Sequence, residues 1–168
     1  PYRLEGKKTL GYEIAEQFNW TLPDIIIYPA GGGTGLIGIW KAFKELIAMG
    51  IIKDPLPRMV LVQSDQCSPM VHLFQQGKLP ENYAPQSSAA YGLAVPYPFA
   101  TQMMLNVLKE SNGIALTVSE QEMDEGIQHI AKTEGQLLSP EGAATFMAAK
   151  KLLQQYGTVK KAADAVKQ

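Results

Sequence analysis

Residues 24–36 read D-I-I-I-Y-P-A-G-G-G-T-G-L, and this stretch decides the fold of the chain. The apolar, β-branched run at residues 24–28 predicts a strand buried on both faces of a parallel sheet. Residues 36–49 then repeat apolar side chains at helical spacing. The expected apolar stripe of this helix comprises Leu36, Trp40, Phe43 and Ile47. A buried strand that turns through glycines into a helix is typical of the α/β class.

The glycine loop, which we define as Gly31, Gly32, Gly33, Thr34 and Gly35, has the composition of an anion site. Glycines let the backbone approach a ligand closely and adopt positive φ angles, so successive N–H groups can converge on a phosphate. The helix that follows directs its positive dipole end and its unpaired N–H groups at the same point. The alternative is a tight turn without a ligand, but four glycines in five residues exceed what a turn requires. We therefore predict phosphate binding.

Several kinds of phosphate-bearing ligand bind to glycine loops of this sort. A P-loop is excluded because no Lys-Ser or Lys-Thr pair follows the glycines. The dinucleotide pattern G-x-G-x-x-G matches Gly33 to Gly38, and Asp65 could bind the ribose of NAD. A single phosphomonoester, as on pyridoxal phosphate, needs only one glycine loop on a helix end. The loop by itself does not distinguish a dinucleotide from a phosphomonoester such as pyridoxal phosphate.

The rest of the chain alternates between strand-like and helix-like stretches. Further strands are expected at residues 58–64 and 113–118. Helices are expected at residues 9–18, 68–76, 100–111 and 119–134, from residue 139 onward, and in the tail at 158–168. The helix at 9–18 is expected to bury Leu10, Ile14 and Phe18. Residues 77–99 carry four prolines and show no period, which indicates a lid or an interface loop.

This order of elements predicts an α/β fold. Parallel strands joined by crossover helices give a sheet covered on both faces, a three-layer αβα arrangement. A parallel sheet of about three strands is small, so we expect residues 1–168 to be a single α/β domain that is incomplete, a fragment of a longer protein. The start at Pro1, without an initiator Met, agrees with that expectation.

Composition excludes several classes of protein. The 168 residues are 46% hydrophobic and 18% charged, with a net charge of −1. The hydrophobic content is too high for a disordered chain. The near-zero net charge excludes a strongly basic nucleic-acid binder and a polybasic membrane-surface protein. No apolar run approaches the ~18 residues of a membrane span. With Cys67 as the sole cysteine, no disulfide forms within the chain, and we expect a cytoplasmic location.

Other reactive side chains have simpler interpretations. Cys67 lies near Asp65 and His72 in the sequence, but without a second Cys or a paired His it lacks metal-ligand spacing, so no metal site is predicted. His129 is expected at the surface or its boundary. The acidic cluster at residues 120–125 suits the start of a helix. The pair Met103-Met104 is expected in the core. A lid or subunit contact is the interpretation for the aromatic residues Tyr91, Tyr97 and Phe99.

Three blocks of this sequence resemble the threonine synthase family. They are P-Y-R-L-E-G-K-K-T at residues 1–9, Y-P-A-G-G-G-T-G-L at 28–36 and S-P-E-G-A-A-T at 139–145. The segment S-A-A-Y-G-L-A-V-P-Y-P around Gly92 is also similar to that family. The resemblance follows the whole chain in the right order. It places the chain among the fold-type-II pyridoxal-phosphate enzymes, with threonine deaminase and the tryptophan synthase β subunit as relatives.

The resemblance implies a cofactor and a reaction. The cofactor is pyridoxal 5′-phosphate, with its phosphate held by the backbone N–H groups of the glycine loop in the large cofactor-binding domain. The reaction converts O-phospho-L-homoserine, a small amino-acid phosphate, to L-threonine and phosphate. Glu141 is expected near the cofactor ring, without an assigned role. A homodimer is expected of the full-length enzyme, and a related lyase or deaminase is the alternative. A non-catalytic dinucleotide-binding module at Gly33 to Gly38 is the alternative from another class.

Two functional features of the family have no counterpart here. The Schiff-base lysine lies upstream of the position that matches Pro1, and the N-T-G-type segment that contacts the pyridine nitrogen follows the last helix. The lysines present are explained by the block at Lys7 and Lys8 and by solvated helix faces. We therefore expect no catalytic residue in this chain and no activity of the chain alone.

Overall fold

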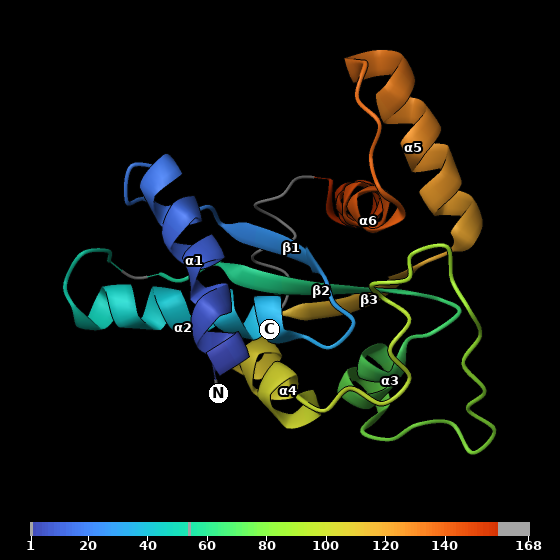
Figure 1. Cartoon of the computed structure of the whole chain (residues 1–168), viewed down its shortest axis with the longest axis horizontal. Helices are drawn as coiled ribbons and strands as arrows, with labels where there is room; N and C mark the ends of the chain where they lie inside the picture. The colour runs from blue at the N-terminus through green and yellow to red at the C-terminus, as the bar shows by residue number, and fades with distance from the viewer. Residues whose placement is uncertain (1, 54, 158–168) are drawn as a thin grey trace.

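Parallel strands β1 (Ile25–Pro29), β2 (Arg58–Ser64) and β3 (Ile114–Val118) form a sheet in the order β1-β2-β3. The computed structural model describes residues 2–53 and 55–157 of the chain (Figure 1). In the sheet register, Val62 lies beside both Pro29 and Leu116. The predicted parallel α/β sheet is therefore confirmed.

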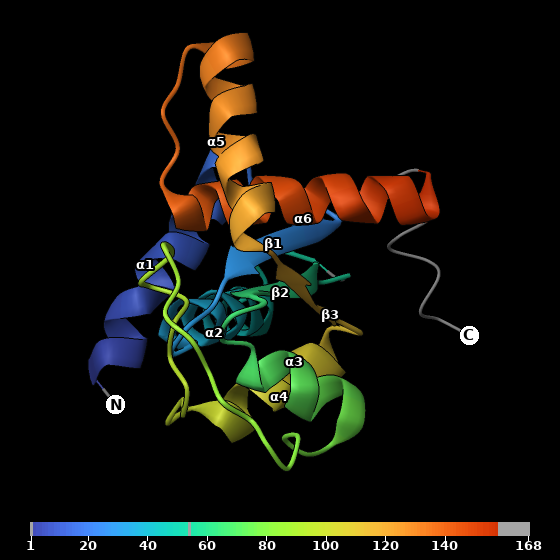
Figure 2. The same ribbon diagram turned by 90° about the vertical axis from the view of Figure 1, so that its right-hand side faces the viewer.

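Helices cover both faces of this sheet (Figure 2). One apolar cluster joins the face that carries Met59 and Leu61 to α1 (Tyr2–Gln17), α2 (Thr34–Ala48), α3 (Pro69–Gln76) and α4 (Thr101–Glu110). A second cluster joins the face that carries Val60 and Val62 to α5 (Glu120–Glu134) and α6 (Pro140–Tyr156). Alternate side chains of β2 thus point to opposite layers, as the pleat of a strand requires.

The strands differ in burial. Every residue of β2 is buried, whereas every residue of β1 is only partly buried. The expectation that residues 24–28 are buried on both faces was therefore too strong. The reason is position, because β1 lies at one edge of the described sheet and β2 lies at its centre.

Helix α1 corrects the expectation for residues 9–18. It begins at Tyr2, and its buried residues are Gly11 and Ala15. Leu10 and Phe18, expected on the buried stripe, are 38% and 54% exposed. Small residues face α2 because the two helices approach closely (an ideal Cβ on Gly11 would lie 2.7 Å from Ala42 Cβ).

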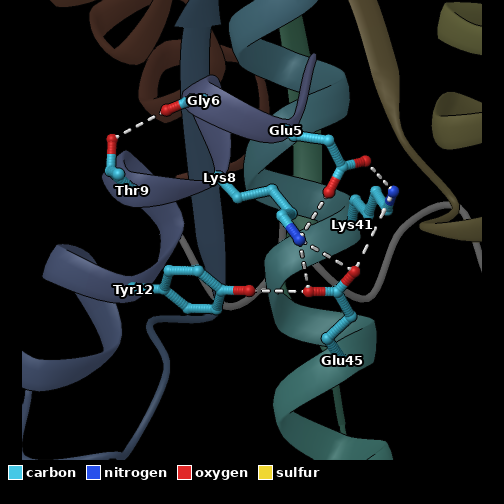
Figure 3. Close-up of polar contacts among 7 residues, drawn as sticks. All are labelled: Glu5, Gly6, Lys8, Thr9, Tyr12, Lys41 and Glu45. Carbon is cyan, nitrogen blue, oxygen red and sulfur yellow. Dashed lines mark hydrogen bonds and ion pairs between the residues drawn. The ribbon is translucent and has the colours of Figure 1, made fainter. Parts of the chain in front are cut away.

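A polar network also joins α1 to α2 (Figure 3). Lys8 Nζ lies 2.8 Å from a Glu5 carboxylate oxygen and 2.9 Å from one of Glu45, and Lys41 pairs with both glutamates. The Tyr12 hydroxyl donates to Glu45 Oε2 at 2.6 Å. Hydrogen bonds from Lys41 and Lys8 lower the pKa of Glu5 to about 2, so this carboxylate is charged at neutral pH.

The predicted helix caps of α5 and α6 are confirmed. Ser119 and Glu122 form a reciprocal capping box at the start of α5. Ser139 Oγ accepts a hydrogen bond from Gly142 N at 3.2 Å, and Pro140 occupies the first turn of α6. The expected irregular stretch at 77–99 contains neither helix nor strand. The predicted helix at residues 158–168 falls outside the described residues.

Candidate functional site

The glycine loop lies between the carboxyl end of β1 and the first turn of α2 (Figure 1). Gly33 is the N-cap of α2 and has φ +80°, a left-handed conformation that side-chain-bearing residues rarely adopt. In an open α/β sheet, ligands bind outside the carboxyl ends of the parallel strands. The loop therefore occupies the edge of the sheet where a ligand is expected.

The backbone of the loop presents free donors. The first hydrogen bond of α2 runs from Ile37 N to Gly33 O at 3.0 Å. Among the hydrogen bonds of residues 2–53 and 55–157, none uses the N–H groups of residues 31–36. Unpaired N–H groups at a helix start, together with the helix dipole, form an anion-binding arrangement. The residues of the loop thus fit a phosphate group, which accepts hydrogen bonds and carries negative charge.

Residues of β1, the irregular stretch and α4 pack against the loop, and the Tyr28 hydroxyl occupies the space where a Cβ of Gly35 would lie. Gly92 O lies against the Cα of Gly31 so closely that a Cβ there would clash, and Val95 Cγ2 would be 2.8 Å from the same Cβ. Met104 Sδ occupies the corresponding space at Gly33. Met104 is fully buried as expected, while Met103, also expected in the core, is 44% exposed and lines a groove between α4 and α2. A side chain at position 31 would therefore clash with the irregular stretch, and only glycine fits there.

Gln63 supports the residue before the loop, although no sequence pattern pointed to it. Its side chain is fully buried in β2. Its Nε2 donates to Ala30 O at 3.0 Å, and its Oε1 accepts from Met70 N at 2.9 Å. Gln63 therefore links the residue before the glycine loop to the first turn of α3. A polar residue directly after the apolar run at residues 59–62 was the available signal.

Two first-turn carboxylates reach the irregular stretch. Glu120 accepts hydrogen bonds from Ser64 Oγ, Ser88 Oγ and Ala89 N at 2.8, 2.6 and 2.8 Å. Glu141 Oε1 accepts from Gly92 N at 2.9 Å. Burial alone raises the pKa of Glu141, but hydrogen bonds led by that from Gly92 outweigh burial and lower it. The same balance, with Ser88 as the leading donor, lowers the pKa of Glu120.

The remaining candidates lie apart from the loop or have structural partners. Cys67 is buried 3.9 Å from the Tyr83 hydroxyl, and burial raises its pKa. His129 is exposed and stacks on Phe146, as expected of a surface residue. Asp65 is exposed and accepts from the Gln66 side chain. Within residues 2–53 and 55–157, no group of three His, Cys, Asp or Glu residues could hold a metal ion, and no helix is long and apolar enough to cross a membrane.

Comparison with protein families matches residues 1–166 to the family described as pyridoxal-phosphate dependent enzyme. The chain belongs to this family. It is 35% identical to threonine synthase of Methanocaldococcus jannaschii over 92% of its own length and 38% of the relative's. It is 33% identical to threonine synthase of Methanosarcina acetivorans, over 91% and 38% of the two lengths. The chain therefore spans a little over a third of the curated relatives that it matches.

Solved structures share the fold of this chain. A processed threonine deaminase isoform from Solanum lycopersicum superposes with a TM-score of 0.67 at 22% identity, covering 92% of this chain and 42% of that protein. A fungal L-serine ammonia-lyase from Rhizomucor miehei gives 0.71 at 20% identity, covering 90% and 46%. Membership of the family identifies pyridoxal phosphate as the cofactor, and the α/β fold is the fold-type-II architecture.

This membership bears on the dinucleotide hypothesis. Gly38, the third glycine of the G-x-G-x-x-G pattern, packs against α1 in this chain. A Cβ on Gly38 would lie 2.8 Å from the backbone carbon of Lys7 in α1. The crossing of α1 over α2 therefore accounts for the third glycine of the pattern without NAD.

Several lysines of the family chain are held by carboxylates. Lys8 and Lys41 belong to the α1–α2 network, Lys44 pairs with Glu110 at 2.9 Å, and Lys151 pairs with Glu122 at 2.7 Å. Lys151 also donates to the Thr117 carbonyl. Solvated helix faces were expected for Lys41, Lys44 and Lys151, whose side chains are 43%, 51% and 37% exposed and each form an ion pair.

Proposed function

We propose that the glycine loop of this chain binds the phosphate of pyridoxal 5′-phosphate in a threonine synthase. The observation that carries the proposal is the run of N–H groups without acceptors at residues 31–36, at the start of α2. The threonine synthases at 35% and 33% identity support the choice of enzyme. The family blocks at residues 28–36 and 139–145 support it as well.

The residues of the loop have distinct parts in this function. The N–H groups of Gly32, Gly33 and Thr34 donate to the phosphate, and the Thr34 hydroxyl adds another donor. The dipole of α2 favours the negative charge. Packing of Gly92, Val95 and Met104 against the loop restricts its movement. Pyridoxal phosphate, when bound, supplies an electron sink for substrate carbanions.

The whole reaction belongs to the full-length protein. In it the Cγ–O bond of O-phospho-L-homoserine breaks and phosphate leaves, a proton takes its place at Cγ, and a hydroxyl from water replaces one hydrogen at Cβ to give L-threonine. The lysine that carries the cofactor comes from residues outside this chain, which is why residues 1–168 alone are inactive in this proposal. A cytoplasmic, homodimeric full-length enzyme, and residues 1–168 as one domain of it, remain predictions from the resemblance and the composition.

A related lyase or deaminase is the second candidate, because the threonine deaminase and serine ammonia-lyase structures share the fold. The whole gene product separates the two. A threonine synthase releases one phosphate for each L-threonine formed from O-phospho-L-homoserine. A deaminase instead releases ammonia from L-threonine or L-serine without phosphate.

The first experiment compares pyridoxal 5′-phosphate with pyridoxal, which lacks the phosphate, as ligands of the chain in calorimetry and ³¹P NMR. Each lost hydrogen bond to a charged group costs ~1.5–3 kcal/mol, which is about tenfold or more in affinity. We expect at least about a tenfold preference for the phosphorylated ligand, and we expect Gly33→Ala to abolish it. Gly50→Ala is the matched control, because Gly50 has φ +71° and nothing within 4 Å of an added Cβ. Equal binding of both ligands by the unaltered chain would refute the phosphate site.

A further inference from the structure

Residues 88–95, which we call the strap, form part of the irregular stretch between α3 and α4 (Figure 2). The strap carries the two groups that pack on Gly31, namely the Gly92 carbonyl and the Val95 side chain. Internal hydrogen bonds from Leu93 N to Ala90 O and from Val95 N to Leu93 O give it a tight turn. The position of this turn therefore limits where the backbone of Gly31 can lie.

The strap is fixed to the rest of the molecule by two carboxylates. Glu141, in the first turn of α6, accepts from Gly92 N at 2.9 Å. Glu120, the first residue of α5, accepts from Ser88 Oγ at 2.6 Å and from Ala89 N at 2.8 Å. Two consecutive helices thus anchor one loop at positions three residues apart.

These carboxylates differ from an ordinary helix-starting glutamate. Glu122, also in the first turn of α5, caps its own helix through Ser119 and pairs with Lys151. Glu120 and Glu141 instead each accept a hydrogen bond from a backbone N–H group of the strap, and Glu120 also accepts from the hydroxyls of Ser64 and Ser88. Both remain charged acceptors despite partial burial, because the hydrogen bonds from the strap lower the pKa of each carboxyl.

We propose that Glu141, assisted by Glu120, is a positioning residue for the phosphate-binding loop. Glu141 holds Gly92 N, and the carbonyl of the same residue packs on Gly31, so the carboxylate sets the place of the first loop residue without touching the loop. In the described part of the chain no hydrogen bond joins Glu141 to residues 31–35. This inference rests on the proposed function, because it assumes that the loop binds the cofactor phosphate.

The test uses Glu141→Ala and Glu141→Gln in the chain with pyridoxal 5′-phosphate, and pyridoxal as the reference ligand. Hydrogen exchange of residues 88–95 reports the strap, and the preference for the phosphorylated ligand reports the loop. Glu141→Ala removes the acceptor, and we expect strap exchange to rise about tenfold and the phosphate preference to fall about tenfold. Glu141→Gln keeps an amide oxygen that can accept from Gly92 N, so it should retain most of both properties.

Glu122→Ala is the matched control. It removes the carboxylate that accepts from Ser119 N in the capping box and that pairs with Lys151, so it should lower the melting temperature while leaving strap exchange and phosphate preference unchanged. Unchanged strap exchange in Glu141→Ala would overturn the proposal, as would a freed strap with full phosphate preference. If the unaltered chain shows no phosphate preference, the proposed function fails and the positioning role fails with it. Strap exchange would still show whether Glu141 anchors the strap.

Discussion

Gln63 combines complete burial with three hydrogen bonds to its amide group. Ala30 O, Met70 N and Val71 N all bond to it, at 3.0, 2.9 and 3.4 Å. A buried polar group without a partner costs ~1–3 kcal/mol. The amide is therefore worth keeping in β2 only because it satisfies backbone groups at the ends of two neighbouring elements.

Replacing this amide gives a stability prediction. Gln63→Met keeps a similar side-chain volume but leaves Ala30 O and Met70 N unpaired, so we expect the free energy of unfolding in urea to fall by about 3 kcal/mol. Gln75→Met is the comparison, because Gln75 is exposed and donates a single hydrogen bond, to Ala115 O. That variant should lose no more than about 1 kcal/mol. Equal losses in the two variants would contradict the special role of Gln63.

At the scale of single residues, the sequence predicts those features that depend on neighbours along the chain. The glycine loop and the Ser119 and Ser139 caps were predicted because each is a local pattern. The partners of Gln63, Glu120 and Glu141 lie at least seven residues away in the sequence, and usually much farther. Such contacts exist only once the strands are paired, so composition and periodicity do not reveal them.

The crossing of α1 over α2 depends on small residues. Gly11 lies under Ala42 and the backbone of Ile39, and a Cβ on Gly11 would be 3.1 Å from Ile39 Cα. Gly38 on α2 plays the same part toward Lys7. This pair of glycines lets the backbones approach, which in turn brings Lys8 within reach of Glu45 (Figure 3).

Replacing Gly6 or Gly11 of α1 by alanine should therefore change the stability of the protein in opposite directions. An added Cβ on Gly6 meets nothing within 4 Å, and alanine is favoured over glycine in a helix by ~0.5–1 kcal/mol. Gly6→Ala should thus raise the melting temperature. Gly11→Ala forces α1 away from α2, and we expect a loss of ~1–3 kcal/mol by overpacking. Thermal unfolding followed by circular dichroism measures both, and a stabilising Gly11→Ala would disprove the close crossing.

The elements that the sequence predicted well are those with strong periods or clear caps. The bounds of β2 are as predicted, and those of α2, α3, α4 and β3 differ from prediction by a residue or two. The buried face of α1 was wrong because the contact is made by Gly11 and Ala15, which carry little hydrophobic signal. Hydrophobic periodicity detects large apolar side chains. Where two helices cross closely, the residues at the contact are small instead.

In the whole molecule, protection from water is uneven. β2 is buried along its entire length between the two helical layers. Helix α5 projects beyond the sheet and packs on α6 through its first half (Figure 1), where Met123 and Gly126 are its buried residues. In residues 128–134 of α5, only Ile130 is even partly buried. Apart from the stacking of His129 on Phe146 of α6, the second half of this helix therefore has little tertiary support.

Native-state hydrogen exchange should reproduce this gradient. Opening free energies range from about zero in poorly supported segments to the global value, ~5 kcal/mol or more, in the core. We expect amides of residues 128–134 to exchange at least about 100-fold faster than those of β2. Residues 124–126, on the same helix but over α6, serve as the internal comparison and should fall between the two. Uniform exchange along α5 would show that the helix opens as one unit, which would mean that its contact with α6, rather than its distance from the sheet, sets its stability.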